Sequence, residues 1–168
     1  MNVKRTILRY VGGFAVTLAA AVLLQALYMA HPDPLTGTLA PINKSPWEQS
    51  KALFWPYLCG AMLIWGLGGD TNQRGGHCTL LFLMPLLCVI AFSFLPEGNP
   101  WLIWSIILAG GITLYALVLD RKLWGGELLW YTIAILLGIA YILFTALPPT
   151  WSIFLDPRDV MTFVPIPF

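Results

Sequence analysis

The sequence predicts an all-α membrane protein with five transmembrane helices. The chain of 168 residues is 58% hydrophobic, only 10% of its residues are charged, and it contains five long apolar stretches. A typical soluble domain is about 45–50% apolar and about 25% charged, so this chain has too few charges to cover a surface in water. A spanning helix needs about 20 mostly apolar residues, because unpaired backbone groups are very costly in hydrocarbon.

The five predicted spans make up most of a single polytopic membrane domain, residues 1–168. They cover residues 6–30, 46–68, 77–95, 101–119 and 127–147. The first span follows a basic segment, but its apolar run is longer than that of a signal peptide, so we expect a permanent helix. The third and fourth spans are joined by the short turn PEGN and should be antiparallel neighbours. A tail, residues 148–168, follows the last span.

The basic residues that flank the spans predict the orientation of the chain. If the N-terminus is cytoplasmic, the inner side holds six of them: Lys4, Arg5, Arg9, Arg74, Arg121 and Lys122. The outer side then holds three: Lys44, Lys51 and Arg158. This excess predicts a cytoplasmic N-terminus and an external C-terminus. The loop 31–50 and the tail then share the outer face.

The stretch SPWE at 45–48 predicts the start of the second span. Ser45 can cap the helix, Pro46 suits its first position, and Glu48 can reach back to the amide of Ser45. Lys51 follows Glu48 by three residues, so the two side chains can pair on one face. Prolines inside the second and third spans, at positions 56 and 85, predict kinks.

A candidate ligand or partner site lies on the outer face. Its polar residues are His31, Asp33, Asn43, Glu48, Lys51, Asp156 and Arg158. We expect the tail to fold over the start of the second span, where Asp156 would pair with Lys51. Arg158 would pair with Glu48 or Asp33. The arrangement is predicted to be a structural lid, with a ligand site, or metal binding by His31, Asp33 and Glu48, as alternatives.

The bodies of the five spans contain no ionisable residue, so a proton relay or charged ion pathway has no residues to use. Gln25 is the most polar side chain within them and is expected to form an interhelical hydrogen bond. Gln25, Trp55, Cys59 and Pro85 are the candidates for lining an apolar cavity between the kinked second and third spans. The two histidines lie at opposite ends of spans, about 30 Å apart, and cannot ligate one haem. No cofactor is predicted.

The run APINKSPWEQSKALFWP at 40–56 resembles the signature of a family of small bacterial integral membrane proteins of uncharacterised function. That signature reads roughly P-V-N-E-S-x-W-E-H-L-K-x-L-F-x-P, and a P-P…F-x-D-P tail accompanies it. The matching residues are Pro41, Asn43, Ser45, Trp47, Glu48, Lys51, Leu53, Phe54 and Pro56, and in the tail Pro148, Pro149, Phe154, Asp156 and Pro157. Lys44 and Gln49 depart from it, since the family has an acidic residue and a histidine there. The resemblance implies a five-helix protein of a bacterial inner or plasma membrane and carries no known activity.

Three functions remain open at the level of sequence. The first is a non-catalytic accessory or structural subunit or helix-packing module, whose partners are the lipid bilayer, other membrane subunits or a second copy of the chain. The second is binding or carriage of a lipid or another apolar or amphipathic small molecule. The third is a membrane enzyme that uses Glu48 and Asp156 at the outer face. A net charge of +1 without a cluster of basic residues predicts no nucleic-acid partner.

Overall fold

The protein is described by a computed structural model over residues 3–66, 74–115 and 127–157. In these residues the regular secondary structure is entirely helical, which confirms the predicted all-α class. The helices are α1 (Val3–Ala30), α2 (Pro34–Leu39), α3 (Pro46–Gly66), α4 (Arg74–Phe94), α5 (Pro100–Leu114) and α6 (Glu127–Ala146), followed by the 3₁₀ turn η3 (Ser152–Phe154).

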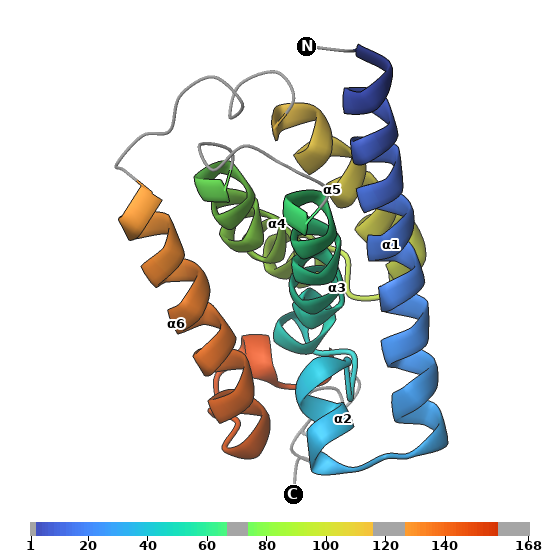
Figure 1. Cartoon of the computed structure of the whole chain (residues 1–168). Helices are drawn as coiled ribbons and strands as arrows, with labels where there is room; N and C mark the ends of the chain where they lie inside the picture. The colour runs from blue at the N-terminus through green and yellow to red at the C-terminus, as the bar shows by residue number, and fades with distance from the viewer. Residues whose placement is uncertain (1–2, 67–73, 116–126, 158–168) are drawn as a thin grey trace, which may run out of the picture.

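Helix α3 is the central element of the bundle. It packs against α1 and α4, while α4 also packs against α5 and α6. Figure 1 shows α1 in blue on one side of α3 and α6 in orange on the other. The short elements α2 and η3 lie at the end of the bundle where α3 begins, whereas α1 begins at the opposite end. The beginning of α1 and the turn η3 therefore lie at opposite ends of the bundle.

The predicted start of α3 and the predicted turn before α5 are both present. The hydroxyl of Ser45 accepts a hydrogen bond from the backbone N–H of Glu48 at 3.2 Å, so it caps α3. The side chain of Asn99 accepts from the N–H of Trp101 at 3.0 Å and caps α5. Both caps satisfy backbone donors that the first turn of a helix leaves unpaired.

Helix α2 was not predicted and lies within the segment 31–50, for which the sequence predicts a loop. Asp33 caps it, with an oxygen that accepts from the N–H of Thr36 at 2.8 Å. Thr36 returns the bond by accepting from the N–H of Asp33, and proline occupies the first position. This reciprocal capping box makes a six-residue helix from residues that carry no long apolar run.

Three helices in the described residues are long and apolar enough to cross a membrane. The candidate spans are Tyr10–Ala30, Arg74–Phe94 and Leu128–Ala146. Helix α5 is apolar but only 15 residues long, and α3 is not among the candidate spans. The first two turns of α3 contain Glu48, Gln49, Ser50 and Lys51, which lower its apolar character. The prediction of five spans is therefore confirmed in part. The structure has a helix at each of the five predicted places, and three of these helices are long and apolar enough to cross a membrane.

Glycines bring pairs of helices into close contact. A Cβ atom at Gly60 would lie 2.8 Å from the carbonyl oxygen of Gly13 and would also clash with the hydroxyl of Thr17. A Cβ atom at Gly111 would meet the side chain of Met84. Small residues thus set the separation of α1 from α3 and of α5 from α4.

Candidate functional site

A fully buried lysine lies at the start of α3. The side chain of Lys51 is 0% exposed, and its ammonium group lies 2.6 Å from Oε2 of Glu48. It also donates to the carbonyl oxygen of Gly37 in α2 at 3.0 Å and to the hydroxyl of Thr145 in α6 at 2.6 Å. An ammonium has three protons, so these three acceptors satisfy it. We call Gly37, Glu48, Lys51 and Thr145 the Lys51 cluster.

The carboxylate of Glu48 holds the loop that precedes α3. Its Oε2 atom accepts a hydrogen bond from the N–H of Ile42 at 3.2 Å as well as the Lys51 bond. The prediction that the Glu48 side chain bonds the backbone amide of Ser45 is wrong, because that amide donates to the side chain of Asn43 at 2.9 Å. The predicted pairing of Glu48 with Lys51 is confirmed.

The other polar residues at the start of α3 face neighbouring helices. The hydroxyl of Ser50 lies 2.6 Å from the hydroxyl of Tyr141 in α6. The side chain of Gln49 donates to the backbone carbonyl oxygen of Asn43 at 2.8 Å, and the backbone carbonyl oxygen of Gln49 accepts from the indole of Trp104 in α5 at 3.1 Å. These polar groups are therefore buried with hydrogen-bond partners, as a low-dielectric interior requires.

The tail contacts the loop before α3. A carboxylate oxygen of Asp156 accepts from the backbone N–H of Lys44 at 3.0 Å. The ring of Phe154 lies 5.0 Å from the ring of Trp47, centroid to centroid. The predicted pairing of Asp156 with Lys51 is wrong, because the ammonium group of Lys51 bonds Gly37, Glu48 and Thr145 instead. The predicted partner of Glu48 or Asp33, Arg158, lies outside the described residues.

A pocket of about 230 Å³, with a partly polar wall, lies between the tail and the start of α3. Asn43, Glu48 and Asp156 line it together, so three of the predicted site residues share one cavity. His31 and Asp33 do not line it.

Asp33 is exposed and caps α2. Its carboxylate accepts a hydrogen bond from the backbone N–H of Thr36, and this bond lowers the pKa of the carboxyl. Among residues 3–66, 74–115 and 127–157, no three metal-ligating side chains are grouped as a metal ion would need.

A second cavity, the α3–α4–α6 groove, has a volume of about 340 Å³ and an apolar wall. Residues that form it include Phe54, Trp55 and Trp65 of α3, Leu81 of α4, and Ile135 and Ile142 of α6. The predicted apolar cavity between the second and third spans is thus present, with α6 as an additional wall. Trp55 lines the groove as predicted, whereas Gln25, Cys59 and Pro85 do not. Gln25 is half-buried in α1 and forms no hydrogen bond with a described residue.

The Lys51 cluster lies about one helical turn beyond the groove, on the side where α3 begins. Lys51 precedes the groove residues Phe54, Trp55 and Leu58 by three, four and seven positions, which places all four on one face of α3. Thr145 follows Ile142 by three positions on α6, so it continues the opposite wall. The indole of Trp55 also donates to the carbonyl oxygen of Thr38 at 2.9 Å. Polar bonds therefore lie where the apolar groove ends.

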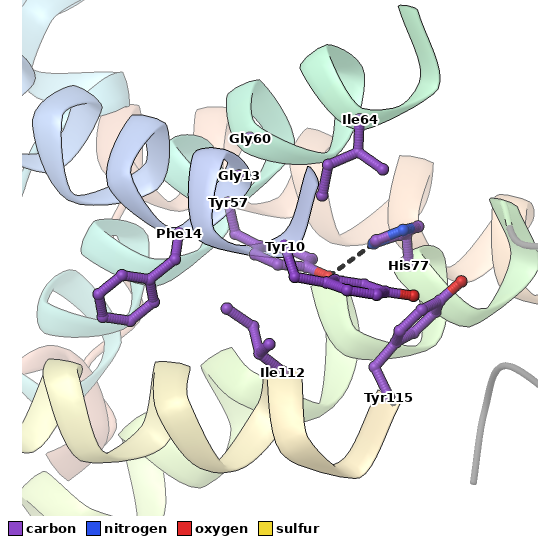
Figure 2. A pocket seen from close by; sticks show the side chains of 9 residues that line it. All are labelled: Tyr10, Gly13, Phe14, Tyr57, Gly60, Ile64, His77, Ile112 and Tyr115. Atoms are coloured by element: carbon purple, nitrogen blue, oxygen red, sulfur yellow. Dashed lines mark hydrogen bonds between the residues drawn. The ribbon is translucent and has the colours of Figure 1, made fainter. Parts of the chain in front are cut away.

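At the other end of the bundle, four helices surround a histidine that the sequence placed at the edge of a span. Helix α4 begins three residues before His77, whose side chain is buried. Its Nδ1 atom lies 2.7 Å from the hydroxyl of Tyr57, and its ring stacks on Tyr115 with centroids 4.4 Å apart. Figure 2 shows these side chains around a small cavity. No local pattern indicates the site, because its residues come from separate helices.

Comparison of the chain with known protein families, curated proteins and solved structures gives no match. The resemblance of residues 40–56 to a bacterial membrane-protein family therefore stays a prediction.

Proposed function

We propose that this chain is a non-catalytic, multi-pass protein of the cell membrane that binds an apolar chain, such as the acyl chain of a lipid, in the α3–α4–α6 groove. The groove is the observation that carries the proposal. Its volume of about 340 Å³ lies within the range of about 300–1,000 Å³ for small-molecule sites.

The position of the groove supports a lipid as its occupant. Two of its walls, α4 and α6, are candidate spans, so the groove opens at the depth of the hydrocarbon. An apolar wall offers no group that would orient a polar ligand, but it favours a hydrocarbon chain through burial of apolar surface. An amphipathic molecule would then keep its polar group outside the groove.

We further propose that α3 and α5 complete five passes, with a cytoplasmic N-terminus and an external C-terminus. The alternating direction of the long helices and the excess of basic residues at the first end support this orientation. Internal bonding of Glu48, Gln49, Ser50 and Lys51 supports α3 as a buried span, since its polar groups do not need water. Labelling of engineered cysteines before α1 and after residue 157 tests this; labelling of both from the same side of the membrane would contradict it.

The surroundings of Glu48 favour a structural role over a catalytic one. Its carboxylate already bonds Lys51 and the Ile42 amide, so it is not a free base. Glu48 and Asp156 do share the pocket between the tail and the start of α3, and this shared wall is the observation that favours an enzyme. Glu48→Gln should lower the melting temperature, and a loss of turnover with an unchanged fold would favour the enzyme instead.

The experiment for the groove uses the full chain purified in a mild detergent. Native mass spectrometry should detect one bound lipid, and Gly138→Leu should reduce lipid retention about tenfold or more, which corresponds to about 1.4 kcal/mol. Gly138 lines the groove, and a Cβ there would have ordinary contacts of 3.5 Å with Phe54. Gly110→Leu is the matched control, because no described atom outside the adjacent backbone of α5 lies within 4 Å of a Cβ at that position.

Two results would overturn the groove proposal. One is wild-type protein that carries no lipid, and the other is equal retention in the two leucine variants. Capture of another polypeptide in place of lipid would favour the accessory-subunit function. Gly12, Gly66 and Gly110 have open space around their α-carbons, and loss of that polypeptide in Gly110→Leu would locate its contact there.

A further inference from the structure

The carboxylate of Glu48 has one oxygen that the Lys51 cluster does not use. Its two hydrogen bonds, from the ammonium of Lys51 and from the N–H of Ile42, both go to Oε2. The other oxygen, Oε1, bonds no described residue, and it is not among the fully buried atoms that lack a partner. Because Glu48 as a whole is only 4% exposed, Oε1 is an accessible acceptor on a side chain that is otherwise buried.

This acceptor belongs to the pocket between the tail and the start of α3. Glu48 lines that pocket, and it lines neither the α3–α4–α6 groove nor the cavity at His77. The pocket has a second carboxylate in its wall, that of Asp156, whereas the ammonium of Lys51 does not line it. Among the described residues, the charged side chains of the wall are therefore both acidic, which favours a cation over an anion.

Aromatic rings form another part of this wall. Phe144 and Phe154 both line the pocket, with ring centroids 5.3 Å apart and ring planes at 82°. Aromatic faces attract organic ammonium groups, and carboxylates form strong hydrogen bonds with them. A metal ion would need more ligands, and the described residues contain no group of three acidic, histidine or cysteine side chains that could hold one. The wall therefore favours an organic cation.

The pocket lies at the depth of lipid head groups. Phe144 and Thr145 are in the last turn of α6, whose candidate span ends at Ala146, and the lining residues of the tail follow that end. The polar head-group region of a bilayer begins where the hydrocarbon core ends. An ammonium group of a phospholipid can therefore reach the pocket, and so can a free amine from the water.

We propose that this pocket binds a primary ammonium group, that of an ethanolamine phospholipid or of a free amine, which donates a hydrogen bond to Oε1 of Glu48. A primary ammonium has three N–H donors, whereas the trimethylammonium group of choline has none, so Oε1 distinguishes the two. The carboxylate of Asp156, which also accepts from the N–H of Lys44, adds negative charge to the wall. The pocket shares no lining residue with the α3–α4–α6 groove, so this proposal does not depend on the groove.

The test compares two phospholipids that differ only in their head groups. The full chain in mild detergent is mixed with equal amounts of phosphatidylethanolamine and phosphatidylcholine, and native mass spectrometry measures the bound lipids. We expect about tenfold more bound phosphatidylethanolamine. The double variant Glu48→Gln with Lys51→Met removes the carboxylate without leaving a buried charge unpaired, and it should lose this preference. Asp33→Asn, which neutralises an exposed carboxylate outside the pocket, is the matched control and should keep it.

Free amines provide a second measurement that needs no variant. Ethanolamine should raise the melting temperature of the wild-type chain, and choline should not. A rise without a lipid preference would identify a free amine as the ligand, and a preference without a rise would identify the phospholipid; either result supports the site.

Two results would contradict the proposal. One is equal behaviour of the ethanolamine and choline compounds in both measurements, which would also follow if Arg158 of the chain itself occupied the pocket. The other is a lipid preference that survives in the double variant. The preference should persist in Gly138→Leu, so the groove and this pocket can each fail alone.

Discussion

The hydroxyl of Thr145 lies 2.6 Å from the ammonium nitrogen of Lys51, so the last turns of α6 are bonded to a charge buried near the start of α3. The two residues are 94 positions apart in the chain. The same ammonium bonds Glu48 and the carbonyl of Gly37. One buried cation therefore joins α2, α3 and α6 at the end of the bundle that also holds the tail.

Lys51→Met should destabilise the protein strongly. It leaves the carboxylate of Glu48, which is 4% exposed, without its cation. Removal of one partner from a buried ion pair typically costs about 3–5 kcal/mol. Denaturant unfolding in detergent micelles, followed by tryptophan fluorescence, measures the change.

The matched control is the double variant Lys51→Met with Glu48→Gln. It removes both charges, and the glutamine oxygen can still accept from the Ile42 amide that Glu48 now bonds. Neutral replacement of a buried pair is often much less costly than breaking it, so the double variant should regain most of the lost stability. Equal losses in the single and the double variants would mean that packing, and not the charge, explains the effect.

Thr145→Val should show how much the α6 contact contributes. Valine keeps the shape but removes the acceptor of the Lys51 proton, and an unsatisfied buried donor costs about 1–3 kcal/mol. Thr132→Val is the control on the same helix, because Thr132 is exposed and, among the described residues, its hydroxyl bonds only the carbonyl of Leu128. That change should stay within about 0.5 kcal/mol. Equal free energies of unfolding for both variants would contradict the role of Thr145.

Asp156→Ala should release the loop before α3 from the tail. The Asp156 carboxylate accepts from the Lys44 N–H at 3.0 Å, and a hydrogen bond to a charged group contributes about 1.5–3 kcal/mol. Hydrogen exchange of the Lys44 amide should become about tenfold faster or more. Asp156→Asn keeps an acceptor oxygen and should exchange more slowly than Asp156→Ala. Unchanged exchange in both variants would show that the bond does not hold the tail.

The helices were predictable because their signals are local. The cap at Ser45, the turn before α5 and the apolar runs each lie within a short stretch of sequence, and the structure has helices at all five predicted places. The pairing of Glu48 with Lys51 is local in the same sense, since one helical turn brings the two together. Helix α2 was missed although Asp33 and Thr36 form a recognisable capping box.

The sites were less predictable because they depend on contacts between helices. Nothing near Lys51 in the sequence indicates that Thr145 would satisfy its third proton, and so Asp156 was assigned to it instead. The cavity at His77 requires Tyr10, Tyr57 and Tyr115 from three other helices. The apolar groove was expected, but its third wall, α6, sets which residues line it.

The cap of α2 should respond to acid. The Thr36 N–H lowers the pKa of Asp33 below its ordinary value of 3.8. A lowered pKa in the folded state means that the cap stabilises α2 fully above the unfolded pKa and loses that contribution as the pH falls through the folded pKa. The Thr36 amide chemical shift should therefore change in acid below about pH 4. Asp33→Asn can still cap but does not titrate, and an equal pH response in that variant would assign the change to another group.

Two glycine-to-alanine substitutions should have opposite effects on stability. At Gly60 a Cβ would lie 2.8 Å from the carbonyl of Gly13 and against the buried hydroxyl of Thr17. Since the carbonyl belongs to the backbone of α1, the two helices must separate, and overpacking of this kind costs about 1–3 kcal/mol. Thermal unfolding in detergent should show a lower melting temperature for Gly60→Ala.

At Gly138 the nearest described atoms to the added methyl group belong to Phe54 at 3.5 Å and Trp55 at 3.8 Å, which are ordinary contacts. Alanine also favours a helix over glycine by about 0.8–1.0 kcal/mol, so Gly138→Ala should raise the melting temperature or leave it unchanged. Both changes add the same methyl group to a helix, and helix propensity alone predicts a gain at both positions. A lower melting temperature for Gly60→Ala, without a lower one for Gly138→Ala, would therefore show that α1 packs closely on α3 at Gly60. A higher melting temperature for both variants would contradict that close contact.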